Sequence, residues 1–135
     1  MRVGKKNLPD VKKKKRKKTR MEKNKSTRYY SDLQENSVAK VLNGLKVANS
    51  GAGKFSSGDV VIKDASLLLE CKTSTAEKKS FSVKKEFLDK NKQEALSNRL
   101  MNGCLCFDFG PGTDRYYVID EKMMKFLVEK LKEDY

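Results

Sequence analysis

The chain has 135 residues, with 31 lysines and arginines against 18 acidic residues, and a formal net charge of +13. Because it contains no histidine, histidine-dependent catalytic triads are excluded. Three cysteines without a fourth ligand favour reduced core thiols over a zinc site, and neither a run of 18 apolar residues nor an apolar leader is present. We therefore expect an intracellular protein that does not cross a membrane.

Most of the positive charge lies in the first 28 residues. They hold 14 basic and 2 acidic residues, a net of +12, whereas residues 29–135 hold 17 basic and 16 acidic residues, a net of +1. This predicts a disordered basic arm over 1–28 and one compact domain over 29–135. Such an arm suits nucleic-acid phosphates, an anionic membrane, nuclear targeting or simple solubility. Its predicted DNA contacts are Lys12, Lys13, Lys14, Lys15, Arg16, Lys17 and Lys18.

A helix is expected after the arm. Ser31 or Asp32 can cap its start, and Gly44 can end it. Glu35 would then lie on the first turn, where a carboxylate complements the positive end of the helix dipole. The apolar positions of this helix would be Leu33, Val38, Val41 and Leu42.

A short strand is expected at 45–48, followed by a glycine- and serine-rich segment at 49–58. Ala48 and Phe55 stand where a P-loop needs glycine and serine or threonine, so a nucleotide-binding loop is excluded. The glycines instead allow the backbone to approach a ligand closely. The side chains predicted to contact phosphate here are Lys54, Ser56 and Ser57.

Two apolar runs, 60–62 and 67–69, are separated by four turn-forming residues and predict an antiparallel pair of strands. Because side chains alternate along a strand, Glu70 and Lys72 should share one face. Asp59 begins the neighbouring strand, within reach of both. The sequence therefore predicts that two carboxylates and one amine converge.

These three charged groups suit phosphodiester hydrolysis. Mg²⁺ or Mn²⁺ prefers oxygen ligands, which Asp59, Glu70 and the backbone carbonyl of Cys71 can supply. Lys72 would orient or deprotonate the attacking water and offset charge in the transition state. The alternative is an ordinary solvated strand face with a weak ion pair between Glu70 and Lys72.

The spacing of Asp59 and the Glu-x-Lys motif at 70–72 resembles the signature of the PD-(D/E)XK nuclease superfamily, although Gly58 stands where that family usually has proline. Within the superfamily, residues 31–72 are similar to Holliday junction resolvases of the archaeal and phage type, which carry a glutamate on an N-terminal helix before a glycine- and serine-rich segment. The resemblance implies that Glu35 is a further catalytic residue and metal ligand. It also implies a homodimer that acts on four-way DNA junctions.

The C-terminal half predicts a helix at 83–101, strands at 104–109 and 115–119, and an amphipathic helix at 121–132. Together with the N-terminal half, this gives an α/β fold with a mixed central sheet flanked by helices. The resemblance implies a restriction-endonuclease-like core, in which the helix at 83–101 borders the active site. Lysines on its polar side are either DNA contacts or part of a solvated face, namely Lys84, Lys85 and Lys90.

We therefore expect a Mg²⁺- or Mn²⁺-dependent endodeoxyribonuclease that resolves four-way junctions by paired symmetric nicks. Two alternatives stay open: another repair or restriction-like nuclease of the same superfamily, and a non-catalytic basic protein that binds nucleic acid. The absence of a separate base-reading domain weighs against sequence-specific restriction. Indifference to divalent metal would distinguish the binding protein from either nuclease.

Overall fold

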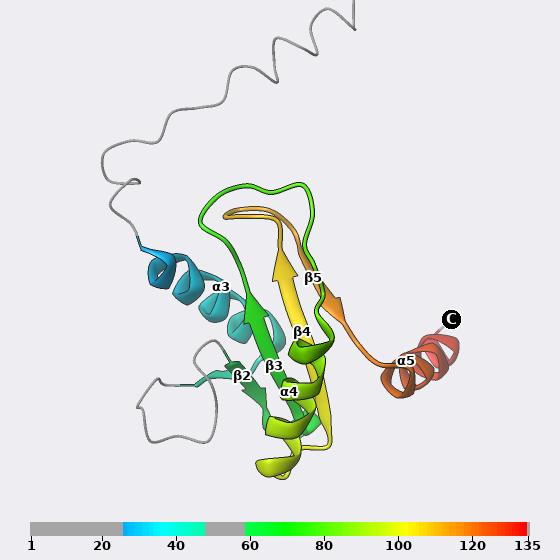
Figure 1. Ribbon diagram of the computed structural model, residues 1–135. Helices are drawn as coiled ribbons and strands as arrows, with labels where there is room; N and C mark the ends of the chain where they lie inside the picture. Colours follow the sequence, from blue (N-terminus) through cyan, green and yellow to red (C-terminus); the bar gives the residue numbers. More distant parts are fainter. Residues whose placement is uncertain (1–25, 48–58, 135) are drawn as a thin grey trace, which may run out of the picture.

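A computed structural model gives the fold of residues 26–47 and 59–134 (Figure 1). Residues 1–25 of the predicted arm and the glycine- and serine-rich segment at 49–58 lie outside these described residues. The DNA contacts predicted in them therefore stay predictions, namely Lys54, Ser56, Ser57 and the basic run from Lys12 to Lys18. The predicted disorder is wrong for the last three residues of the arm, because Ser26 caps a helix that contains Thr27 and Arg28.

The described elements, labelled as in Figure 1, follow the predicted order of helix, three strands, helix, two strands and helix. They are α3 (Thr27–Leu42), β1 (Leu45–Lys46), β2 (Asp59–Ile62), the short 3-10 turn η1 (Lys63–Ala65), β3 (Leu67–Lys72), α4 (Lys85–Ser97), β4 (Asn102–Asp108), β5 (Arg115–Val118) and α5 (Glu121–Asp134).

The five strands form one mixed sheet in the order β1-β2-β3-β4-β5. Neighbouring strands are antiparallel except β3 and β4, which run parallel and place Cys71 opposite Cys106. A parallel pair needs a crossover connection, and α4 lies in it. The predicted α/β class with a mixed sheet is therefore confirmed.

Helices cover both faces of the sheet. α3 packs through Val38 against Val60 and Leu69 on one face. α4 packs through Ala95 against Leu68 on the other face. Figure 1 shows α4 in front of the strands and α3 behind them. Because side chains alternate along β2 and β3, adjacent residues of these strands serve opposite helices.

α3 begins earlier than the sequence analysis predicts. Ser26 caps it, because its Oγ accepts a hydrogen bond from the amide of Tyr29 at 3.2 Å. The predicted caps at Ser31 and Asp32 are wrong, since both residues lie inside the helix. The helix ends with Asn43 in the left-handed conformation, at a φ of 56°. Glu35 is therefore the ninth residue of the helix and does not lie on its first turn.

The side of α3 that faces the sheet is more polar than predicted. Gln34 and Glu35 are buried beside Val38, whereas Leu33 and Val41, two predicted core positions, are exposed. Burying a polar side chain is costly unless it finds a hydrogen-bonding or charged partner. Gln34 and Glu35 have such partners, described below, and these make the polar face possible.

The two C-terminal helices also differ from their predicted bounds. α4 is shorter than the predicted helix at 83–101, because its chain turns after Ser97 and the amide of Leu100 donates back to the carbonyl of Ala95 at 2.8 Å. α5 extends to Asp134 and has no buried side chain. No helix within the described ranges is long and apolar enough to cross a membrane.

Candidate functional site

Asp59 and Glu70 face each other across β2 and β3. They are register partners in the antiparallel pair, so their side chains leave the sheet on the same side. Both are buried: Asp59 has no exposed surface, and Glu70 exposes 4%. Acidic side chains are almost never buried so fully without a compensating charge or ligand. The pair therefore marks a place where such compensation is required.

A third carboxylate comes from α4. One carboxylate oxygen each of Asp59, Glu70 and Glu94 lies within 4.8 Å of the other two. Ala95, the next residue on α4, is buried against the sheet and anchors the helix at this level. Three elements that are separate in the sequence thus bring three acidic groups together.

A close contact between α4 and β4 fixes how near the helix lies to the sheet. Asn91 is buried, and its Nδ2 donates a hydrogen bond to the carbonyl of Leu68 at 3.2 Å. Gly103 of β4 leaves the space that this side chain fills, because a β-carbon there would overlap Asn91 Oδ1. The contact allows α4 to carry Glu94 up to the other carboxylates.

Lys72 lies two residues beyond Glu70 on β3. Its Nζ is 2.9 Å from Glu70 Oε2 and 4.3 Å from the ring centroid of Phe87 on α4. The ion pair and the cation–π contact hold the ammonium in place, while 32% of the Lys72 side chain stays exposed. The predicted convergence of Asp59, Glu70 and Lys72 is confirmed, and their catalytic roles stay predictions.

The carboxylate group fits a divalent cation. Glu70 Oε1 is buried and accepts no hydrogen bond from the described residues. Because a buried oxygen without a partner is costly, this atom is available to a ligand such as a cation. Mg²⁺ and Mn²⁺ take oxygen ligands of this kind, and Asp59, Glu70 and Glu94 are the side chains that would hold one. The part of the Cys71 carbonyl stays a prediction.

A buried polar network fixes the end of β3 that carries Lys72. Gln34 of α3 donates through Nε2 to the carbonyl of Lys72 at 2.8 Å and to Asp108 Oδ2 at 3.2 Å. Asp108 also accepts hydrogen bonds from the hydroxyl of Thr73 at 2.7 Å and from the amide of Gly110 at 3.1 Å. The backbone of Lys72 therefore cannot shift without breaking bonds that connect α3, β3 and β4.

Glu35 is not among the three clustered carboxylates. It lies on α3, which packs on the opposite face of the sheet, where Val60 and Leu69 point. Glu35 Oε1 is 3.9 Å from Lys46 Nζ. Burial raises the pKa of the Glu35 carboxyl above its usual value, against the opposing attraction of Lys46. Glu35 thus lies outside the group of three carboxylates, and its implied role as a ligand stays a prediction.

Cys71 points away from the carboxylate group. Its side chain packs with the core beneath α3, and the residue lies opposite Cys106 in the parallel pair. The hydrogen bond between the two thiols raises the pKa of Cys71, to which burial adds, and lowers the pKa of Cys106. All three cysteines are free thiols, as the sequence analysis predicts.

The predicted DNA-contacting lysines of α4 take different positions. Lys84 directly precedes the helix without a capping hydrogen bond from its side chain, and its Nζ is 5.7 Å from the centroid of the Phe87 ring that also contacts Lys72. Lys85 is exposed and pairs with Asp89 at 2.8 Å, while Lys90 is exposed farther along the helix. Lys84 therefore lies beside the candidate site, and the other two lie on the solvent side of α4.

Glu94 is the site residue that the sequence analysis missed. Its position on α4 could have indicated this role. Glu94 directly precedes the buried Ala95 and follows the buried Asn91 by three residues, so it borders the face of the helix that meets the sheet. An acidic residue at such a boundary is a candidate for an inward-facing carboxylate. The predicted helix contains this pattern, but the sequence analysis considers only its lysines as candidate contacts.

Comparison of the chain with models of protein families, with characterised proteins and with solved structures found no match.

Proposed function

We propose that this protein is a metal-dependent endonuclease that acts on branched DNA. One observation carries the proposal: carboxylate oxygens of Asp59, Glu70 and Glu94 lie within 4.8 Å of one another, and Lys72 is bonded to Glu70 at their edge. An ordinary solvated strand face does not bury two acidic side chains opposite each other. A cation site beside a partly exposed lysine accounts for both the burial and the clustering.

Each side chain has a distinct part in the proposed chemistry. The three carboxylates hold Mg²⁺ or Mn²⁺, which when bound supplies charge neutralisation at the scissile phosphate and activation of water. Lys72 orients the attacking water and offsets negative charge that develops in the transition state. Phe87 restricts the directions that the Lys72 ammonium can take, and Lys84 contacts a neighbouring phosphate.

Branched DNA is proposed as the substrate on the basis of charge and of the resemblance in residue spacing. The chain carries a net charge of +13, which favours a polyanionic partner. The acids on β2 and β3, next to a crossover helix, also agree with a restriction-endonuclease-like core. A resolvase would need two such sites, one for each of two opposed strands, to make symmetric nicks in a four-way junction.

The test is cleavage of a labelled four-way junction, a linear duplex and a single strand, each with Mg²⁺, Mn²⁺ or EDTA. Glu70→Gln and Glu94→Gln should each slow cleavage by roughly 100-fold or more, because each removes a charge that holds the cation. Binding of the junction in EDTA should change little. Glu86→Gln, an exposed acid on the same helix as Glu94, is the matched control and should cleave at the wild-type rate.

The outcomes separate the candidate functions. Metal-dependent cutting of junction and duplex at equal rates would remove the resolvase assignment and leave the nuclease. No product from any of the three DNA substrates with either metal would overturn the nuclease and favour a non-catalytic binding protein.

A further inference from the structure

α5 carries an apolar stripe that no part of the described fold covers. Met124, Leu127, Val128 and Leu131 recur every three or four residues and so share one side of the helix. Met124, Leu127 and Leu131 each expose 42–48% of their surface, and none of the side chains of α5 is buried. In Figure 1, α5 follows β5 and stands clear of the two helices that flank the sheet.

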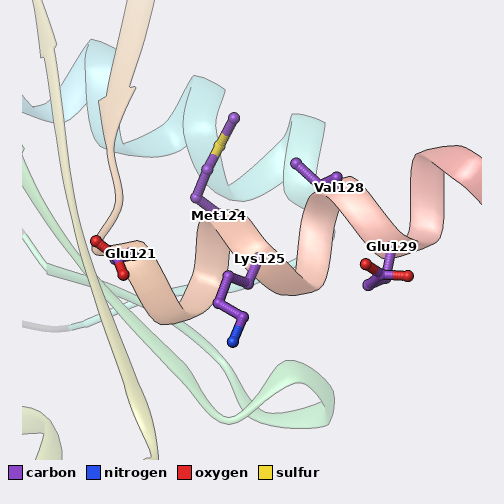
Figure 2. A pocket seen from close by; sticks show the side chains of 5 residues that line it. All are labelled: Glu121, Met124, Lys125, Val128 and Glu129. Carbon is purple, nitrogen blue, oxygen red and sulfur yellow. The ribbon is translucent and has the colours of Figure 1, made fainter.

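Two residues of the stripe, Met124 and Val128, line one wall of a shallow groove on α5. Figure 2 shows Met124 and Val128 on one side of the helix, with Lys125 and Glu129 turned the other way. Glu121 completes the lining at the start of the helix. An apolar wall with a charged flank is the arrangement of a helix that pairs with another helix.

We propose that the α5 stripe docks against α5 of a second copy of this chain, with the two helices antiparallel. The stripe matches itself in that orientation. With Leu127 and Val128 at the two-fold axis, Met124 of one copy meets the partner's Leu131, and the reverse contact follows by symmetry.

The charges beside the stripe match in the same orientation. Glu121, Lys125, Glu129 and Lys132 follow one flank of the helix and alternate in sign. In an antiparallel pair this flank faces itself, so Glu121 lies opposite the partner's Lys132, and Lys125 lies opposite the partner's Glu129. Within one helix Lys132 and Glu129 are 3.5 Å apart and exposed, a weak pair that can be exchanged.

The charge of α5 argues against other binding partners for the stripe. α5 holds four lysines and four acidic residues, so its net charge is zero and it has little attraction for DNA or an anionic membrane. The basic arm at residues 1–25 of the same chain is poor in apolar residues and offers no matching stripe.

The size of the contact sets the strength of the expected dimer. A helix of 14 residues is about 21 Å long, and one such pair buries less than the roughly 800 Å² per partner of a standard interface. The dimer should therefore dissociate on dilution, with a Kd on the order of micromolar.

Sedimentation velocity of the full chain, without DNA and over a series of concentrations, tests this proposal. The wild type should shift from monomer to dimer as concentration rises, and Leu127→Asp should weaken the dimer at least tenfold. Phe126→Asp is the matched control, because Phe126 exposes 65% of its surface on the opposite side of α5. A monomer at every concentration, or equal loss in the two variants, would overturn the proposal.

A charge exchange tests the antiparallel orientation. Glu121→Lys and Lys132→Glu should each weaken the dimer, because each places like charges opposite each other, and the double variant should restore it. A double variant as weak as the two single ones would overturn the antiparallel pairing. Both experiments measure the mass of the protein in solution and not DNA cleavage, so their results are independent of the nuclease proposal.

Discussion

The two carboxylate oxygens of Glu70 have different surroundings at the candidate site. Its Oε2 pairs with Lys72 at 2.9 Å, whereas its buried Oε1 accepts no hydrogen bond from the part of the chain that the structure describes. The same carboxylate can therefore orient the lysine with one oxygen and offer the other to a cation. A substitution at Glu70 should disturb both functions, whereas one at Glu94 should leave the pair between Glu70 and Lys72 in place.

Glu35 should make folding stability depend on pH. Because burial raises the pKa of its carboxyl, the folded state favours the protonated form. The unfolding free energy should therefore fall as the pH rises from the usual value of 4.5 through the raised folded pKa, and then stay level. Glu35→Gln cannot ionise, so it should be more stable than the wild type at neutral pH and nearly equal to it in acid.

Denaturant unfolding on both sides of that pH range measures this difference, with Glu77→Gln, an exposed acid, as the control. A variant that loses stability relative to the wild type as the pH rises would contradict the expectation. Cleavage by Glu35→Gln at the wild-type rate would also remove the catalytic role that the resemblance implies for Glu35.

Part of the site could be predicted because it depends on local alternation. Asp59, Glu70 and Lys72 lie on two adjacent strands joined by a short turn, so the pleat alone brings them together. Glu94 could not be placed in this way, because its position depends on how closely α4 docks. Glu35 was expected with Asp59, but the packing of Val38 turns its side of α3 toward the other face of the sheet.

At the scale of elements, the docking of α4 determines whether Glu94 reaches the site. The contact depends on Asn91, which bonds to the carbonyl of Leu68 and fills the space above Gly103. A helix held by a polar contact of this kind has less freedom to slide along the sheet than one held by apolar packing alone.

Gly103→Ala should destabilise the protein by about 1–3 kcal/mol, because the added methyl group overlaps Asn91 and forces α4 away from the sheet. Denaturant unfolding gives the change, and the double variant with Asn91→Ala tests its cause. Removing the Asn91 side chain relieves the overlap, so the double variant should be destabilised by less than the sum of the two single effects. Strict additivity would show that the cost arises elsewhere.

The elements themselves could be predicted where apolar runs and turns are distinct, as in β2, η1 and β3. The start of α3 could not, because Ser26 and Ser31 are both suitable caps. The end of α4 was also missed. Leu100 continues the apolar pattern, but it reaches the core from the turn that follows the helix.

At the scale of the whole molecule, charge is divided between the arm and the body. Residues 1–25 hold 13 basic and 2 acidic residues, whereas α5 is neutral. We expect affinity for DNA to come mainly from the arm, and discrimination between DNA shapes to come from the folded body.

Deleting residues 1–25 tests this division and keeps Ser26, the cap of α3. The shortened protein should stay folded, because the deleted residues have little apolar surface to bury. Its DNA affinity should be lower and should depend less steeply on salt, with a slope smaller by about 0.9 for each phosphate that the arm neutralises. Circular dichroism and binding at several salt concentrations measure the two effects. An unchanged salt slope would assign DNA binding to the body instead.

The hydrogen bonds of Gln34 join distant parts of the chain: Lys72 is 38 positions away and Asp108 is 74. Such bonds form only after the intervening residues have reached their places. During synthesis the acidic residues of β2 and β3 emerge well before β4, so the end of β3 acquires its final anchor last. A nascent chain should therefore complete its candidate site only after Asp108 has left the ribosome.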